Sequence, residues 1–284
     1  MRSSETYLME INADGLFLKG DQHHVCEDYA LFSKNEALSF AMISDGCSGS
    51  QHTSVGARLI AHACRTVLLG MEAYELSHIS HADLGKKIIS KAAEAAALIH
   101  DRTDILDATL ICAFADKVNQ RVIVMVYGDG SVTWKDKSGS VKHMCVDYPS
   151  EYPRYLSYLL DEERNKILLQ KSPNGMNQTW LTSGEEPEVI NMDIEQPTFV
   201  VIPMEDLQWV MVSSDGLDTF FDSVAGRGLS KNAVLAELSS VKGLHGEFIN
   251  RRVNRMVKQF QKNGIYHGDD LSVAGLSFCE EEKQ

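Results

Sequence analysis

The chain has 284 residues, of which 44% are hydrophobic and 24% are charged, as in an ordinary soluble globular protein. Its formal net charge of −13 argues against nucleic acid as the main partner, because phosphate binding needs a basic surface. No apolar run reaches the roughly 18 residues that span a bilayer, and no apolar signal segment opens the chain. We therefore expect a cytoplasmic protein with no membrane partner, and its six scattered cysteines fit reduced thiols.

The first part of the chain is expected to contain three strands followed by two helices. Short apolar runs bounded by turn residues predict strands at 16–18, 29–32 and 38–44. Apolar residues then recur at helical spacing over 55–68, and more loosely over 84–98.

The middle of the chain predicts a β-meander and then a long excursion. Residues 108–114 and 121–127 are separated by a short turn and are expected to form an antiparallel hairpin, and 131–135 to continue the meander. Residues from about 138 to 196 are polar and rich in turn formers, so they are interpreted as irregular, with a short helical patch near 154–160. A connection this long is usually functional, which favours a flap-like insertion.

The last part of the chain predicts two strands, two helices and a closing strand. These elements are expected at 198–203, 208–213, 231–238, 248–260 and 271–278. Three arginines in the second helix, Arg251, Arg252 and Arg255, are interpreted as its solvent-facing side. Runs of neighbouring strands favour antiparallel sheets, so we predict the α+β class, with helices covering two packed sheets in a single domain over 1–284.

Four short acidic turns punctuate these elements. They read Cys26-Glu27-Asp28, Ser44-Asp45-Gly46, Ser214-Asp215-Gly216 and Gly268-Asp269-Asp270. Each lies at one end of a strand-like run, so loops can bring the carboxylates together at the rim of a sheet. One Asp-Gly pair alone is a common turn, but crowded carboxylates repel each other unless a cation neutralises them. Hard ions such as Mg²⁺ and Mn²⁺ prefer such oxygen ligands, so the set predicts a metal centre.

Six motifs follow one another in a recognisable order. They are Gly20 with His23 and Cys26-Glu27-Asp28, Ser44-Asp45-Gly46, Asp107-Ala108-Thr109-Leu110, Gly128-Asp129-Gly130, Ser214-Asp215-Gly216-Leu217 and Asp269-Asp270-Leu271-Ser272. In this order they resemble the metal-dependent protein phosphatases of the 2C type, and the stretch Tyr152-Pro153-Arg154-Tyr155-Leu156 resembles their bacterial branch. The resemblance spans roughly residues 14 to 278.

This resemblance implies a four-layer αββα sandwich, in which two antiparallel β-sheets are flanked by helix pairs. It also implies two or three Mg²⁺ or Mn²⁺ ions at one end, held by Asp45, Gly46, Asp215, Asp269, Asp129, Glu27 and Asp28. Asp45 would bridge two ions, with Asp28, Asp215 and Asp269 as its catalytic partners. Two such ions activate water for attack on phosphorus and neutralise the phosphate.

Three residues depart from the family pattern. His23 stands where members commonly have an arginine that holds the substrate phosphate, and it lacks the guanidinium fork. We assign His23 the phosphate-binding role, with an ordinary surface histidine as the alternative. Cys47 replaces a histidine proposed to protonate the leaving group and is interpreted as a packing residue. Asp270 replaces an asparagine, which would tighten metal binding or share the ligand role of Asp269.

The leading functional hypothesis is a metal-dependent phosphoserine and phosphothreonine protein phosphatase that acts in signalling as a monomer. Its partner would be a phosphorylated protein. A pseudophosphatase that binds phosphoproteins is the alternative suggested by His23 and Cys47. A hydrolase of small phosphoesters is a third reading.

Overall fold

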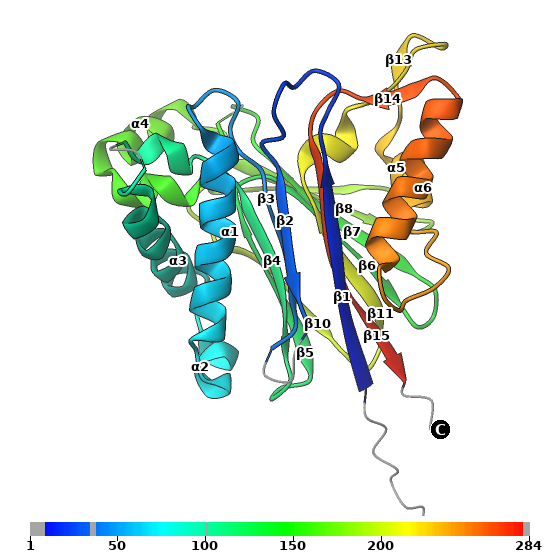
Figure 1. The fold of residues 1–284 in the computed structure, drawn as a ribbon, viewed down its shortest axis with the longest axis horizontal. Coiled ribbons are helices and arrows are strands. Elements are labelled where there is room, and N and C mark those ends of the chain that lie inside the picture. The colour runs from blue at the N-terminus through cyan, green and yellow to red at the C-terminus, as the bar shows by residue number, and fades with distance from the viewer. Residues whose placement is uncertain (1–8, 35–37, 100–101, 151, 281–284) are drawn as a thin grey trace, which may run out of the picture.

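The computed structural model describes residues 9–34, 38–99, 102–150 and 152–280, and two antiparallel sheets dominate it (Figure 1). The larger sheet has seven strands in the order β1 (Met9–Leu18), β15 (Leu271–Glu280), β11 (Leu207–Ser213), β6 (Gly130–Asp136), β7 (Val141–Asp147), β8 (Met176–Thr182) and β9 (Glu188–Met192). The smaller sheet has five, in the order β10 (Thr198–Pro203), β5 (Arg121–Tyr127), β4 (Leu110–Asp116), β3 (Phe40–Ser44) and β2 (Tyr29–Ser33). A third, small sheet joins β13 (Arg227–Gly228), β12 (Phe220–Asp222) and β14 (Ile265–His267).

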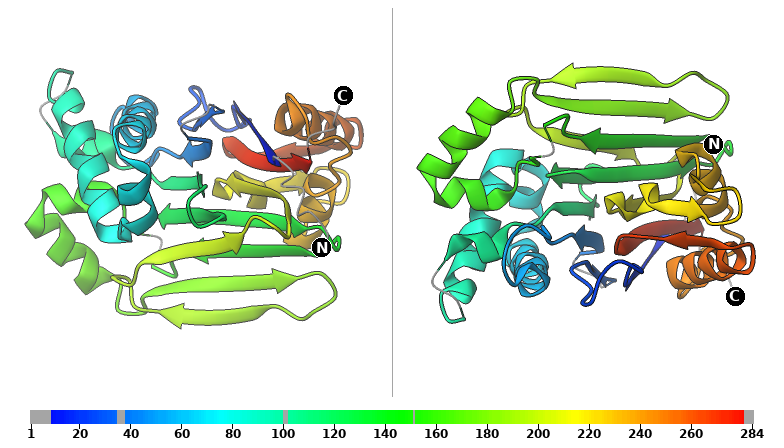
Figure 2. Two further views of the ribbon diagram at one scale, coloured as in Figure 1. Left: turned by 90° about the horizontal axis from the view of Figure 1, so that it is seen from below. Right: turned by 90° about the horizontal axis from the view of Figure 1, so that it is seen from above.

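Helices cover the outer sides of the two large sheets (Figure 2). The α-helices are α1 (Thr53–Leu69), α2 (Ala73–His78), α3 (His81–Ala96), α4 (Glu162–Lys171), α5 (Lys231–Leu238) and α6 (Phe248–Lys262). Short 3₁₀ turns are η1 (Thr103–Leu106), η2 (Leu156–Leu160) and η3 (Asp215–Asp218). Apolar residues of α1 and α3 pack on the smaller sheet, and those of α5 and α6 pack on the larger one. Within the described residues, no helix combines the length and the apolar character that crossing a bilayer requires.

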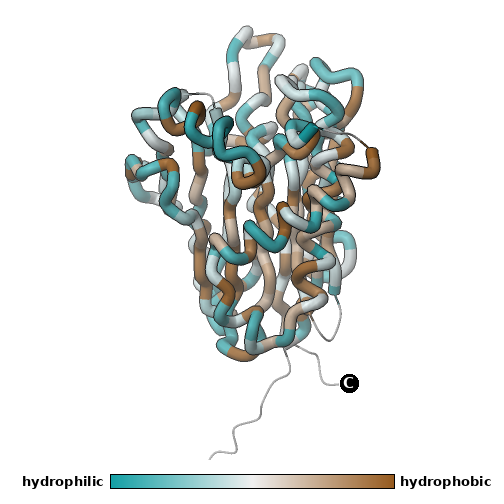
Figure 3. The backbone as a smooth tube through the Cα atoms, turned by 90° about the vertical axis from the view of Figure 1, so that its left-hand side faces the viewer, coloured by the Kyte–Doolittle hydropathy of each residue, from teal (hydrophilic) through white to brown (hydrophobic). Residues whose placement is uncertain are grey.

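Strand β4 shows why the layers stack in this way. Successive side chains of a strand point to opposite faces. Ile111 and Ala113 therefore join the core between the two sheets, while Cys112 and Phe114 join the core beneath α1 and α3. Both faces are covered, so the strand is apolar almost throughout. Figure 3 shows hydrophobic and hydrophilic residues mixed along the backbone, with many hydrophobic residues in the strands.

The α+β class with antiparallel sheets is confirmed, and so is the hairpin of β4 and β5. The meander interpretation is wrong at β6, which pairs with β11 in the other sheet. Gly128 and Gly130, at φ 90° and 121°, allow the chain to cross between the sheets there.

The interpretation of 138–196 as irregular is also wrong, because β7, β8 and β9 extend the larger sheet. Four of the five residues of β9 are exposed, so the strand lacks the alternation that reveals a half-buried strand. Arg252 is not on the solvent-facing side of its helix. It is 8% exposed, and its Nη2 lies 2.6 Å from Oε2 of Glu237.

His143 of β7 is a buried titratable group in the larger sheet. Its Nδ1 lies 2.8 Å from the hydroxyl of Thr133. Burial, and then the charge of Lys231, lower the pKa of His143 from 6.5 to about 3. The unfolded chain therefore binds a proton more readily than the folded chain between these two values. The contribution of the neutral His143 ring to the free energy of unfolding is fully present above pH 6.5 and is lost as the pH falls toward 3.

Replacing this ring by an uncharged amide should reduce the acid sensitivity of the fold. We expect His143→Gln to flatten the fall in unfolding free energy below pH 6.5, where the histidine contributes at most about 1.4 kcal/mol per pH unit. Thermal and urea unfolding across this pH range provide the measurement. His245→Gln is the control, because the His245 side chain is 70% exposed. Parallel pH profiles for wild type and His143→Gln would contradict the prediction.

Candidate functional site

The register of the strands gathers the acidic turns at one rim of the two sheets, the upper end in Figure 1. Tyr29 at the start of β2 pairs with Ser44 at the end of β3. Asp28, just before β2, and Asp45, just after β3, therefore lie side by side. In the larger sheet Ser213 pairs with both Ser131 and Val273. The turns that carry Asp129, Asp215 and Asp269 therefore meet at the same rim.

Asp28, Asp45 and Asp215 form the centre of this arrangement. The charges of Asp28 and Asp215 both act on Asp45. Burial raises the pKa of Asp28 to about 7, and the charge of Asp215 adds to this effect. Burial and then the Asp28 and Asp215 charges raise the pKa of Asp45 well above its ordinary value. Desolvation and the Asp269 charge raise the pKa of Asp215, although its side chain is also partly open to solvent.

Asp129 and Asp269 lie at the edge of this centre. Burial and then the charge of Asp215 raise the pKa of Asp129 to about 7, and Asp269 acts in the same direction. The Asp269 side chain is 40% exposed. All five aspartates that the sequence predicts as ligands are therefore close enough to repel one another.

The residues fit a cation by their chemistry. Asp28 is fully buried, yet its Oδ1 has no hydrogen-bond partner among the described residues. An unpaired carboxylate oxygen beside other carboxylates is a costly arrangement that a divalent ion would relieve. Across the described ranges, however, no three His, Cys, Asp or Glu side chains are already arranged to hold one ion together.

His23 lies among acids. Its Nε2 is 3.1 Å from Oδ1 of Asp269, and its Nδ1 is 3.2 Å from Oδ2 of Asp270. Glu27 Oε2 lies 3.7 Å from the same Nδ1. Both ring nitrogens therefore face carboxylates. The phosphate-binding role predicted for His23 requires that the ring leave one of these partners.

Asp270 joins the N-terminal loop to the C-terminal turn. Its Oδ1 accepts a hydrogen bond from the backbone N–H of Gly20 at 2.7 Å, and its Oδ2 accepts one from Glu27 at 2.6 Å. The side chain is 2% exposed. Both oxygens are thus used in fixing the loop that carries His23 and Glu27, which favours an anchoring role over the ligand role considered for Asp270.

Glu27 fixes the loop that follows Asp45. Ser48 Oγ donates to Glu27 Oε2 at 2.7 Å, and Thr53 Oγ1 donates to Oε1 at 3.0 Å. Gly46 is buried there, and a Cβ atom on it would lie only 2.9 Å from Thr53. The close approach explains why glycine follows Asp45.

Three residues to which the sequence assigned no role at the metal site also shape it. Ser214 Oγ donates to Asp28 Oδ2 at 2.7 Å. His267 is buried, with its Nδ1 2.8 Å from the backbone oxygen of Asp269. Asp107 accepts hydrogen bonds from Ser50 and Ser157. A serine or histidine beside an acidic turn was the only available signal, since the partners of Ser214 and Asp107 lie far away in sequence, although that of His267 is only two residues away.

The two oxygens of Asp270 yield a stability prediction. Asp270→Asn should lower the unfolding free energy by about 1–3 kcal/mol, because the amide group cannot accept from both Gly20 and Glu27. The measurement is urea unfolding with a chelator present. Asp269→Asn is the matched control, since its remaining oxygen can still accept from the N–H of Asp270. Equal stability of wild type and Asp270→Asn would refute the anchoring role.

Known proteins place this arrangement in a family. The chain is similar to a bacterial serine phosphatase, with 13% identity, a TM-score of 0.55, and coverage of 97% of this chain and 100% of the other. For a serine/threonine phosphatase from S. agalactiae, the identity is 15%, the TM-score 0.53, and the coverage 94% and 99%. For the phosphatase Stp1 from Staphylococcus aureus, the identity is 11%, the TM-score 0.53, and the coverage 94% of each chain.

These identities establish a shared fold. A search among curated proteins found no match. The family model described as protein phosphatase 2C matches residues 20–258, which includes all of the acidic turns except the last. The chain belongs to the protein phosphatase 2C family.

Proposed function

We propose that this chain is a Mg²⁺- or Mn²⁺-dependent phosphatase that removes phosphate from phosphoserine and phosphothreonine residues of proteins. The family supports a phosphatase and is metal-dependent in general. The observation that carries the proposal is the crowding of Asp28, Asp45 and Asp215 at one rim, where the charges of Asp28 and Asp215 raise the pKa of Asp45 and the charge of Asp215 raises the pKa of Asp28. A divalent cation relieves this repulsion.

The proposed ligands are Asp45, the Gly46 carbonyl, Asp215, Asp269 and Asp129, with Asp28 and Glu27 acting through water. When bound, the ions would supply Lewis-acid activation of water and neutralise phosphate charge. Ser214 orients the Asp28 carboxylate, and Ser48 with Thr53 orients Glu27. His23 would turn from Asp269 toward the incoming phosphate and donate a hydrogen bond to it.

We also propose that residues 1–284 act as one catalytic domain. The acids come from both ends of the chain, since Asp28 and Asp215 interact directly. The flap-like role of residues 138–196 is supported by Arg164, whose Nη2 donates to Asp107 Oδ2 at 2.7 Å. All six cysteines are free in the described structure, which favours a reducing, cytoplasmic setting. The monomeric state stays a prediction.

A pseudophosphatase that binds phosphoproteins is the second candidate. It is favoured by His23, whose two ring nitrogens both face carboxylates, while the family commonly places an arginine at this position. A phosphate would have to displace one of these contacts.

Neutralising one central acid should weaken metal binding and should also stabilise the metal-free protein. Asp45→Asn should raise the melting temperature in chelator, because it removes a half-buried like charge, and should lose the stabilisation by Mn²⁺. For wild type that stabilisation is about 2.7 kcal/mol when the free metal is about a hundredfold above its dissociation constant. Thermal unfolding measures both effects. Exposed Asp206→Asn is the control, and an unchanged Mn²⁺ response in Asp45→Asn would argue against this centre.

Activity separates the two candidates. Wild type should hydrolyse a phosphothreonine peptide with Mn²⁺ and stop when chelator is added. Asp45→Asn should lose at least about a hundredfold in rate, as when one group that stabilises transition-state charge is removed. Phosphate release is the readout, with Asp206→Asn as the control. Metal binding by wild type without any turnover would instead favour the pseudophosphatase.

A further inference from the structure

The helix layer leaves one edge of the smaller sheet uncovered. Strand β10 lies at that edge, and its residues alternate between buried and exposed. Val200 faces the core between the sheets, whereas Phe199 and Val201 on the other face are 51% and 43% exposed. Their register partners on β5, Met125 and Ile123, are buried beneath the helices. Two large apolar side chains thus remain without cover beside a packed core.

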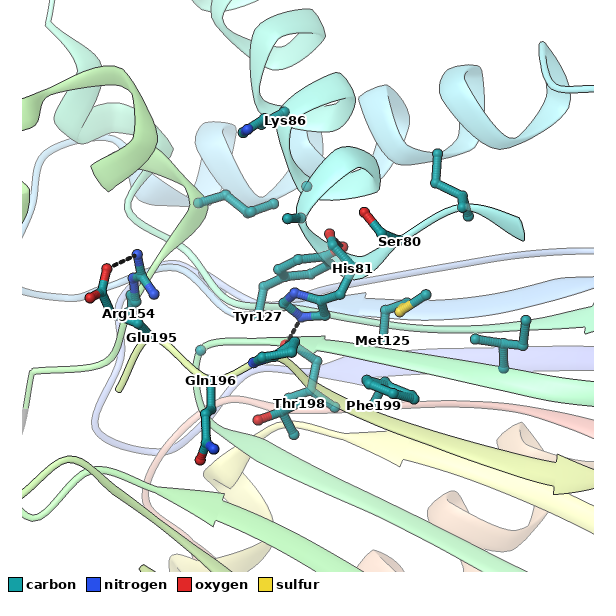
Figure 4. Close-up of a pocket in the computed structure, with 18 of the residues that line it drawn as sticks. Ser80, His81, Lys86, Met125, Tyr127, Arg154, Glu195, Gln196, Thr198 and Phe199 are labelled. Atoms are coloured by element: carbon teal, nitrogen blue, oxygen red, sulfur yellow. Dashed lines mark hydrogen bonds and ion pairs between the residues drawn. The ribbon is translucent and has the colours of Figure 1, made fainter. Parts of the chain in front are cut away.

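A cavity of about 560 Å³ lies over these side chains, between β10, β5 and the beginning of α3 (Figure 4). Its apolar lining includes Ile79, Met125, Leu156, Ile194, Phe199 and Val201. A cavity of this size lies within the usual range of ligand sites, which is about 300–1,000 Å³. It has room for more than one aliphatic side chain.

One wall of the cavity is held in place by internal contacts. The rings of His81 and Tyr127 stack with their centroids 4.2 Å apart. Tyr127 donates from its hydroxyl to the backbone oxygen of His81 at 2.7 Å, and His81 Nε2 lies 2.9 Å from the oxygen of Val126. Since these polar groups are already paired, they favour an apolar occupant of a preformed space.

The rim of the cavity is cationic in an acidic protein. Its lining includes Lys86, Arg121 and Arg154 but only one acid, Glu195. Arg154 Nη2 lies 3.4 Å from Glu195 Oε1, and Arg121 is paired with Asp116 outside the lining. With both arginines paired, Lys86 is the one cation of the described lining that has no acid partner, in a chain whose net charge is −13. It would attract an acidic segment and repel a basic one.

The cavity continues toward the candidate catalytic residues. Gly128 lines it and directly precedes Asp129. Tyr148 and Tyr155 also line it, and the charge of Asp129 acts on both phenols. Ser157, two residues after Tyr155, donates to the Asp107 carboxylate, and the backbone oxygen of Asp107 accepts from the N–H of Cys47, which follows the Asp45-Gly46 turn. A chain segment in the cavity could therefore extend to the acidic rim.

The outer edge of β10 suits an extended segment. Within the described part of the chain, the backbone of β10 pairs with no strand other than β5. An edge strand offers backbone donors and acceptors to another strand, and apolar pockets beside it can then select alternate side chains.

The cavity and the outer edge of β10 together form a groove. We propose that this groove binds an extended, acidic segment of the phosphorylated protein substrate, which adds to β10 and buries one or two aliphatic side chains over Phe199 and Val201. The proposal rests on the proposed phosphatase function and specifies its substrates. They would carry aliphatic residues at alternate positions near the phosphorylated residue.

Binding of unphosphorylated peptides tests the groove without turnover. The probes are short, fluorescein-labelled acidic peptides with glutamate in place of the phosphorylated residue. One peptide has two leucines at alternate positions before that glutamate, and another has them after it. Each has a matched peptide with alanines in place of the leucines. Fluorescence anisotropy with Mn²⁺ gives the dissociation constants. We expect the leucine peptide of one arrangement to bind at least about tenfold more tightly than its alanine match, from burial of aliphatic side chains.

Variants of the protein show whether the groove residues cause the preference for leucine peptides. Val201→Asp and Phe199→Ala should each abolish the difference between leucine and alanine peptides. Val118→Asp should keep it, because Val118 is 58% exposed and lies outside the groove. Thermal unfolding checks that each variant is folded. Equal binding of leucine and alanine peptides by wild type, or a preference that survives in both groove variants, would overturn the proposal.

Kinetics separate this proposal from the proposed function. If phosphorylated versions of the peptides are hydrolysed, kcat/KM should follow the same leucine preference, and equal values would count against the groove as a substrate site. If no phosphopeptide is hydrolysed, the phosphatase function fails, while the anisotropy result still supports or overturns binding at β10.

Discussion

Repulsion among carboxylates at one rim of the two sheets is the constraint on which the rest of the structure depends. Asp28 is buried beside Asp45 and Asp215, where the charge of Asp215 raises the pKa of Asp28 and the charges of Asp28 and Asp215 raise the pKa of Asp45. Strands from both ends of the chain bring these acids together. The pairing of strands in the folded protein therefore holds the acids close to one another, and the residues next to each acid in the sequence do not. The same repulsion makes a cation favourable at this place.

Other acids hold the loops around that centre. Asp270 accepts from the backbone of Gly20 and Glu27, and thereby connects segments 250 and 243 residues apart. Asp107 binds both the loop after Asp45 and the segment at 138–196. Acids with donors around them thus act as anchors, whereas acids without enough donors form the proposed metal centre. Hydrogen bonding distinguishes the two groups, because their residue types are the same.

Sequence patterns predicted many of the elements. The predicted bounds of β5, β10 and α5 agree with the structure, and α6 begins at Phe248 as predicted. Strands β7 to β9 were missed because polar and exposed residues in them conceal the alternation. The acidic turns were visible because Asp-Gly pairs ended apolar runs. The contribution of Ser214 was not visible, because its partner Asp28 lies 186 residues away in the sequence.

The most direct test of the central claim is to locate the metal itself. Crystals of the full chain grown with Mn²⁺ would be measured by anomalous X-ray diffraction at the manganese edge. The account predicts anomalous peaks between Asp45, Asp215 and Asp269, with Asp28 nearby. Fully ordered crystals with no peak at this rim, or with manganese bound only elsewhere, would contradict it.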